Sequence, residues 1–247
     1  MPCVMMRASK HSRWTNVLGL ACGFWLAPGL EKARAAGGSY MVDDFDVNDA
    51  GICTLEASYG AARNGDIIAA STPGCGFKLG KLPMEIDGEF QRTRASDVWT
   101  ANAGTTVKAV LLPMTNHVGI GLSTTALWDT TTGASASTNI NLPVTLELTN
   151  QLRLHVNGGW LYDRGFGQSF ATWGISPEYT LNRYVQLTVE LFQQSGKTVD
   201  PRTVNTPRLQ TGVRLSPTDK LDIDVIYGRN INGENAHWVT VGFTVEF

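Results

Sequence analysis

The last residues of the chain, 237–247, constrain its fold more than any other segment. From Val239 to Phe247, apolar side chains occupy every second position, and threonine, glycine and glutamate occupy the positions between them. A period of two is that of a β-strand, in which successive side chains point to opposite faces of the sheet. We therefore predict a strand with one wholly apolar face, formed by Val239, Val241, Phe243, Val245 and Phe247.

The same alternation recurs through most of the sequence, in short runs separated by turn residues. No helix is predicted after Gly51, and no apolar run reaches the roughly 20 residues that a membrane-spanning helix needs. Ten strands plus a disulfide-closed periplasmic hairpin is one interpretation. Our preferred prediction is twelve antiparallel strands, at residues 51–62, 66–77, 82–93, 98–112, 117–129, 137–149, 151–163, 169–180, 183–195, 206–216, 219–229 and 237–247.

The connections between these runs alternate in length. Transmembrane barrels have this asymmetry, with short turns on the periplasmic side and longer loops outside. We therefore predict an all-β fold, a transmembrane antiparallel up-and-down β-barrel whose apolar faces contact the lipid bilayer. A soluble periplasmic β-sandwich is the alternative. The short connections are 113–116, 149–151, 181–183 and 216–219, and the longer ones are 129–137, 164–169, 195–206 and 229–236.

The N-terminus has the composition of a secretory signal. Basic residues precede a largely apolar stretch at 16–30, and Ala33-Arg34-Ala35 then fits a small-x-small cleavage site. We predict a cleaved signal peptide over residues 1–35, with translation starting at Met1, Met5 or Met6. Such a signal, followed by a transmembrane barrel, predicts the outer membrane of a Gram-negative bacterium as the location.

The segment after the predicted cleavage site, 36–50, is acidic and rich in turn residues. We predict that it is a flexible lead-in to a barrel domain at 51–247. Without residues 1–35 the chain keeps 15 basic and 21 acidic side chains. This acidic excess excludes nucleic acid as an expected partner.

Two cysteines, Cys53 and Cys75, remain after the predicted cleavage. In an oxidising periplasm such a pair tends to form a disulfide. Asn64-Gly65 lies midway between them and is a strong signal for a tight hairpin. A two-residue turn there places position 53 opposite position 76, so we expect a small bulge to bring the two thiols together.

The polar faces of the strands are predicted to line an enclosed lumen. Opposite charges fall on neighbouring strands, with Glu190 beside Arg214 and Arg214 beside Asp222 or Asp224. We expect them to pair, because an unpaired buried charge is costly. The network either fills the barrel or lines a path for a solute. Its predicted members are Lys108, Glu147, Arg153, His155, Glu178, Glu190, Arg208, Arg214, Asp222, Asp224 and Glu246.

No pattern in the sequence indicates an enzyme. The inward-facing histidine, His155, has no evident serine beside it, and His117 and His237 lie at strand ends. G-x-S-x-G, H-E-x-x-H, P-loop and paired-cysteine zinc motifs do not occur in the sequence. We predict a protein with no catalytic residue, no cofactor and no metal site.

Three stretches resemble a family of outer-membrane proteins named for the MetA pathway of phenol degradation: 154–164 (LHVNGGWLYDR), 172–192 (TWGISPEYTLNRYVQLTVELF) and 209–247. The chain end, with its alternating residues before Phe247, also resembles the signal that the barrel-assembly machinery reads. The resemblance implies a channel or transporter for small molecules, including hydrophobic or aromatic ones, and the assembly machinery as a partner. A barrel that does not transport, and instead anchors or binds at the surface, is the alternative.

Overall fold

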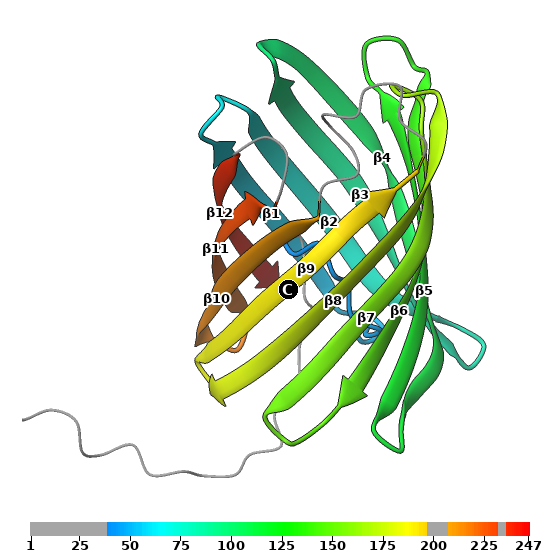
Figure 1. Cartoon of the computed structure of the whole chain (residues 1–247). Helices are drawn as coiled ribbons and strands as arrows, with labels where there is room; N and C mark the ends of the chain where they lie inside the picture. Colours follow the sequence, from blue (N-terminus) through cyan, green and yellow to red (C-terminus); the bar gives the residue numbers. More distant parts are fainter. Residues whose placement is uncertain (1–38, 197–206, 232–235) are drawn as a thin grey trace, which may run out of the picture. The chain divides into compact units, whose positions relative to one another are not determined.

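The computed structural model describes residues 39–196, 207–231 and 236–247, which form one sheet of twelve antiparallel strands (Figure 1). The predicted strand bounds agree with the observed ones to within a few residues. The predicted signal peptide lies outside the described residues. The strands are β1 (Cys53–Ala62), β2 (Ile67–Leu79), β3 (Leu82–Ala95), β4 (Val98–Thr115), β5 (Val118–Asp129), β6 (Ser135–Glu147), β7 (Leu152–Asp163), β8 (Gln168–Asn182), β9 (Val185–Ser195), β10 (Arg208–Thr218), β11 (Leu221–Asn230) and β12 (His237–Glu246).

The sheet closes on itself, because β1 pairs with β12 as well as with β2. At the end of this seam, Cys53 N donates to Phe247 O at 3.2 Å, and Phe247 N donates to Cys53 O at 2.9 Å. The twelve-stranded prediction is confirmed, and the ten-stranded alternative is wrong because β1 and β2 are part of the wall. A closed ring leaves no unpaired strand edge, which is the condition for a sheet inside a bilayer.

The connections differ between the two ends of the barrel. The end that holds Phe247 carries tight turns, such as Asn116-His117, where both residues have positive φ (50° and 66°). The opposite end carries the longer connections 130–134, 164–167, 196–207 and 231–236. The predicted asymmetry is therefore confirmed for strands β4 to β12, whereas β1 to β4 have short connections at both ends.

Alternation sorts the side chains of the strands into an outer and an inner set. On β12, Val239, Val241 and Phe243 are 49%, 49% and 44% exposed, as the apolar face predicted for the last strand requires. Large apolar side chains are exposed in this way on every strand of the ring. The outer surface therefore suits contact with lipid rather than water.

Among the described residues, no helix is long and apolar enough to cross a bilayer.

A disulfide joins β1 to β2 on the outer side of the barrel. Cys53 and Cys75 are direct partners in the strand register, with their Cα atoms 4.1 Å apart. The predicted disulfide is confirmed, but the predicted bulge is not needed. The turn holds three residues, because Ala62 N donates to Asp66 O, and Gly65 takes the positive φ (91°) that such a loop requires.

The segment before β1 is not the flexible lead-in that its composition suggests. Residues 39–50 lie inside the ring of strands, where the dark-blue trace of Figure 1 runs. Val42, Asp44 and Phe45 are 1%, 0% and 4% exposed. We call residues 39–50 the plug. Asp43, Asp44 and Asp46 pair with cations of the wall, so the acidic composition that suggested disorder reflects those partners.

Candidate functional site

Wall side chains satisfy the backbone of the plug. Glu190 on β9 accepts hydrogen bonds from the N–H groups of Met41 (3.1 Å) and Val42 (3.0 Å). Asn157 on β7 accepts from Asp43 N at 2.8 Å and donates to Asp43 O at 2.6 Å. The plug thus needs no strand pairing of its own, because buried backbone groups are satisfied by side chains that point into the lumen.

Ion pairs attach the plug to a second set of wall residues. Lys108 on β4 lies 2.8 Å from Asp43 and 3.3 Å from Asp44, measured from its Nζ to their Oδ1 atoms. Arg153 on β7 lies 2.8 Å from Asp46. These cations are almost fully buried, so loss of a plug carboxylate would leave a buried positive charge less well compensated.

Burial also shifts the acid–base behaviour of the plug. Desolvation by burial, together with the neighbouring charge of Asp44, raises the pKa of Asp46 to about 6, and Arg153 opposes the shift. Burial likewise raises the pKa of Asp43, against the pull of Lys108. Both carboxyl groups therefore bind a proton more readily in the docked plug than in water.

Glycines on the inner face of five strands make room for the plug. A Cβ added at Gly119 would lie 2.6–2.7 Å from the ring of Phe45, and one at Gly174 would lie 2.6 Å from Val42 Cγ2. Side chains at these positions would overlap the plug, so the wall is shaped to it. The full set, which we call the glycine contacts, is Gly76, Gly119, Gly121, Gly174, Gly212 and Gly242.

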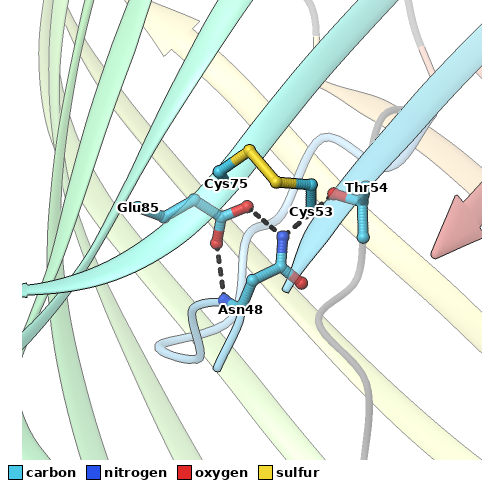
Figure 2. The surroundings of a disulfide bond; sticks show 5 residues. All are labelled: Asn48, Cys53, Thr54, Cys75 and Glu85. Atoms are coloured by element: carbon cyan, nitrogen blue, oxygen red, sulfur yellow. Dashed lines mark hydrogen bonds between the residues drawn. A yellow bond between two sulfur atoms is a disulfide. The ribbon is translucent and has the colours of Figure 1, made fainter. Parts of the chain in front are cut away.

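The end of the plug near β1 is held by a different group of contacts (Figure 2). Asn48 donates to Glu85 on β3 through its backbone N (2.7 Å) and its Nδ2 (2.6 Å), and its Nδ2 also donates to Thr54 at 2.9 Å. Gly51 N donates to Gly76 O, and Gly76 N donates to Ile52 O. The plug is thereby attached to the wall beside the Cys53–Cys75 disulfide.

The structure places eight of the eleven predicted lumen residues in the buried interior. Arg214 faces Asp224 in the register, with Nε–Oδ1 and Nη2–Oδ2 distances of 2.9 Å each, as predicted. Glu190, however, lies opposite Gln210, from which it accepts a hydrogen bond. The eight buried residues are Lys108, Arg153, His155, Glu178, Glu190, Arg214, Asp222 and Asp224.

The other three predicted residues are only partly buried, because they lie near strand ends. Glu147 is at the turn end of β6, where His117 Nδ1 lies 3.3 Å from its Oε2. Glu246 is at the seam and Arg208 begins β10. Thus Glu147 and Glu246 belong to the rim of the barrel at the Phe247 end, and Arg208 belongs to the opposite end.

His155 is part of the support for the plug. Its Nδ1 hydrogen-bonds Thr145 Oγ1 at 2.9 Å, and its Nε2 lies 3.4 Å from Glu178. Thr145 in turn accepts from Phe45 N. Ser176 stands opposite His155 in the register, but its buried hydroxyl makes no hydrogen bond to any described residue, His155 included. A serine–histidine pair for hydrolysis is therefore not formed.

Sequence reasoning missed two groups of lumen residues. The plug carboxylates Asp43, Asp44 and Asp46 fall in a segment without periodicity, so nothing marked them as inward-facing. Glu56, Glu85, Asp87 and Glu89 lie on the inner face of β1 and β3. Their alternation with apolar neighbours, as in Glu85-Ile86-Asp87, was the signal that could have found them.

Comparison with solved structures shows the same fold in outer-membrane channels. The "KdgM porin" is 11% identical, with a TM-score of 0.57 over 78% of this chain and 99% of that chain. The "NanC porin" is 8% identical, with a TM-score of 0.59 over 77% and 98%. The "CymD monoaromatic hydrocarbon channel" is 7% identical, with a TM-score of 0.53 over 81% and 89%.

Sequence comparison is more limited. No curated protein matches the sequence of this chain. One family model matches residues 24–247, which is nearly the whole chain. The chain therefore belongs to the family described as "Uncharacterised conserved protein UCP029691".

Proposed function

We propose that the protein is an outer-membrane channel for small polar solutes, closed in this structure by its own plug. The observation that carries this proposal is the nature of the contacts between plug and wall. They are mainly hydrogen bonds and ion pairs, and the same polar wall would be hydrated if the plug withdrew. A barrel filled for stability alone is better served by apolar packing, because buried ion pairs add little stability over it.

The location and partners are part of the proposal. The apolar outer surface and the fold shared with outer-membrane porins support insertion in the outer-membrane bilayer. The alternating last strand, ending on Phe247, supports recognition by the barrel-assembly machinery. The resemblance to the MetA-pathway family and the name of CymD suggest hydrophobic or aromatic solutes. The charged lumen favours polar ones instead.

A disulfide that locks the plug tests the channel directly. A Cβ added at Gly174 lies 3.6 Å from the Cβ of Val42, within the roughly 3.5–4.5 Å that disulfides span. Val42→Cys/Gly174→Cys, made in a Cys53→Ser/Cys75→Ser background, would cross-link plug and wall reversibly. In planar bilayers we expect discrete conductance under reducing conditions and none after oxidation. Val42→Cys alone, in the same background, is the control for the oxidant.

A barrel that does not transport is the second candidate, and the glycine contacts favour it. A wall shaped around a segment suits a permanent filling as well as a gate. This candidate predicts silence in bilayers and no swelling of liposomes with any solute, in the wild type and in the reduced cysteine variant alike. That result, obtained with correctly folded protein, would overturn the channel proposal.

A further inference from the structure

A pocket of about 110 Å³ lies between the plug and the long-loop ends of β6 to β10. Met41 of the plug is part of its lining, together with residues that lie near the same end of five consecutive strands. The lining residues are Met41, Asn139, Asn141, Asn157, Leu161, Thr172, Trp173, Gly174, Phe192, Gln193, Gln194 and Arg208.

The charge of the pocket is unbalanced. Among the described residues that line it, Arg208 is the one charged residue and none is a carboxylate. Among the described residues, Arg208 has no ion pair or hydrogen-bond partner, whereas Lys108, Arg153 and Arg214 deeper in the lumen each face a carboxylate. A half-buried guanidinium without a counter-charge attracts an anion, and its planar fork matches a carboxylate in particular.

The rest of the polar lining consists of amides and a hydroxyl. The side-chain oxygen of Asn139 is buried and has no hydrogen-bond partner among the residues that the structure describes. Asn141 donates to Asn157 at 3.0 Å, which leaves the other polar atoms of Asn141 available. Amide side chains both donate and accept hydrogen bonds, so they suit hydroxyl groups of a ligand. An unsatisfied buried acceptor such as Asn139 Oδ1 gains most from a ligand donor.

We propose that this pocket binds small hydroxylated carboxylates, with the carboxylate on Arg208 and a hydroxyl donating to Asn139. Two independent observations support the site: the unpaired cation and the unsatisfied amide oxygen line the same pocket. The role of the site in passage through the lumen rests on the proposed channel function. Binding itself does not, because the pocket is formed while the plug is in place.

Three small ligands test the carboxylate contact at Arg208 and the hydroxyl contact at Asn139 separately: glycerate, propionate and glycerol. Binding to the detergent-solubilised protein is measured by calorimetric titration. Glycerate carries both groups and is expected to bind best, propionate lacks the hydroxyls, and glycerol lacks the charge. We expect Arg208→Gln to weaken glycerate binding by about tenfold or more, since it removes a charge-assisted hydrogen bond. Arg208→Lys, which keeps the positive charge, should lose less of the affinity for glycerate.

Further variants keep the result interpretable. Arg183→Gln, at an exposed turn at the opposite end of the barrel, is the matched control and should leave binding unchanged. Asn139→Leu should lower the affinity for glycerate more than that for propionate. Unchanged heat-modifiable gel mobility shows that each variant remains folded.

The outcomes distinguish the two proposals. No measurable glycerate binding, equal binding by Arg208→Gln, or equal binding of glycerol and glycerate would overturn the site. If the protein conducts in bilayers but glycerate does not bind, the site alone is wrong. If glycerate binds through Arg208 but no conductance appears, the channel proposal fails and the binding site stands.

Discussion

Two sectors of the inner wall hold the plug by different means. In the first, which we call the cation sector, Lys108 on β4 and Arg153 on β7 pair with plug carboxylates. In the second, the carboxylate sector of β1 and β3, Glu85 accepts hydrogen bonds from the neutral Asn48. Glu89 of the same sector accepts from Thr106 at 2.6 Å.

These two kinds of contact differ in the free energy that their loss would cost when the plug withdraws. Removal of an ion pair from the cation sector leaves buried charge, whereas the carboxylates of the second sector lose only neutral donors that water can replace. The carboxylate sector is also next to the attachment of the plug to β1. The plug is therefore expected to open by releasing the cation sector while it stays tethered at the carboxylate sector.

Lys108→Met is expected to have the largest effect, because it removes the cation that pairs with both Asp43 and Asp44. The fully buried Asp44 makes the loss of docking free energy about 3 kcal/mol. A cysteine in place of the buried Val42 reports undocking through its rate of labelling by a bulky maleimide. We expect labelling to accelerate by about a hundredfold. An unchanged rate would show that the pairs with Lys108 do not hold the plug.

Gly119→Val is expected to come next, because its side chain would overlap the ring of Phe45. Overpacking of this kind costs about 1–3 kcal/mol. In the same labelling assay, the Val42 position should become accessible without any change of charge. Gly158→Val is the matched control, since a Cβ there has no neighbour within 4 Å. Equal rates in both variants would contradict the steric role of the glycine contacts.

Docking of the plug is also expected to depend on pH. Docking raises the pKa of Asp46 from its ordinary value of 3.8 to about 6. The docked plug therefore binds a proton more tightly than the released plug does. The resulting stabilisation of docking is fully present below pH 4 and is lost as the pH rises through 6. Between pH 5 and pH 8 we expect docking to weaken by up to about tenfold.

The pH measurement needs two controls. Labelling is normalised to an exposed cysteine, Asp97→Cys, because thiol reactivity itself depends on pH. In Asp46→Asn the pH dependence should shrink, since the contribution of Asp46 is removed while the raised pKa of Asp43 remains. Docking that strengthens with rising pH would contradict the assignment.

Glu85→Gln is expected to have the smallest effect. The amide oxygen still accepts one of the two hydrogen bonds from Asn48, and no cation of the plug loses its partner. The docking free energy should change by about 1 kcal/mol or less. If this variant releases the plug as strongly as Lys108→Met does, the proposed difference between the two sectors is wrong.

The strands of the barrel wall could be predicted from the sequence, but the plug inside the barrel could not. Period-two alternation is a property of each strand by itself, so the strands, their number and the Arg214–Asp224 pair could be predicted locally. The Cys53–Cys75 disulfide was predictable from the turn between the cysteines. The plug was not, because irregular backbone held by wall side chains has no period to detect.

The first three strands show a related limit. Short residues such as Gly74 and Gly76 stand on the inner face of β2, whereas later strands such as β7, β9 and β11 carry charged residues there. The contrast between the two faces is thereby weakened, and the carboxylates of β1 and β3 were overlooked. The inner glycines of β5, β8, β10 and β12 could be recognised as contacts only once the plug was seen beside them.

The glycine contacts carry one consequence for how such a pore would behave electrically. They occur on β2, β5, β8, β10 and β12, so the wall meets residues 39–49 around most of its circumference. A small displacement leaves no continuous water path past so many points of close approach. In single-channel recordings, the current should then step between a closed level and a fully open level, without intermediate conductances.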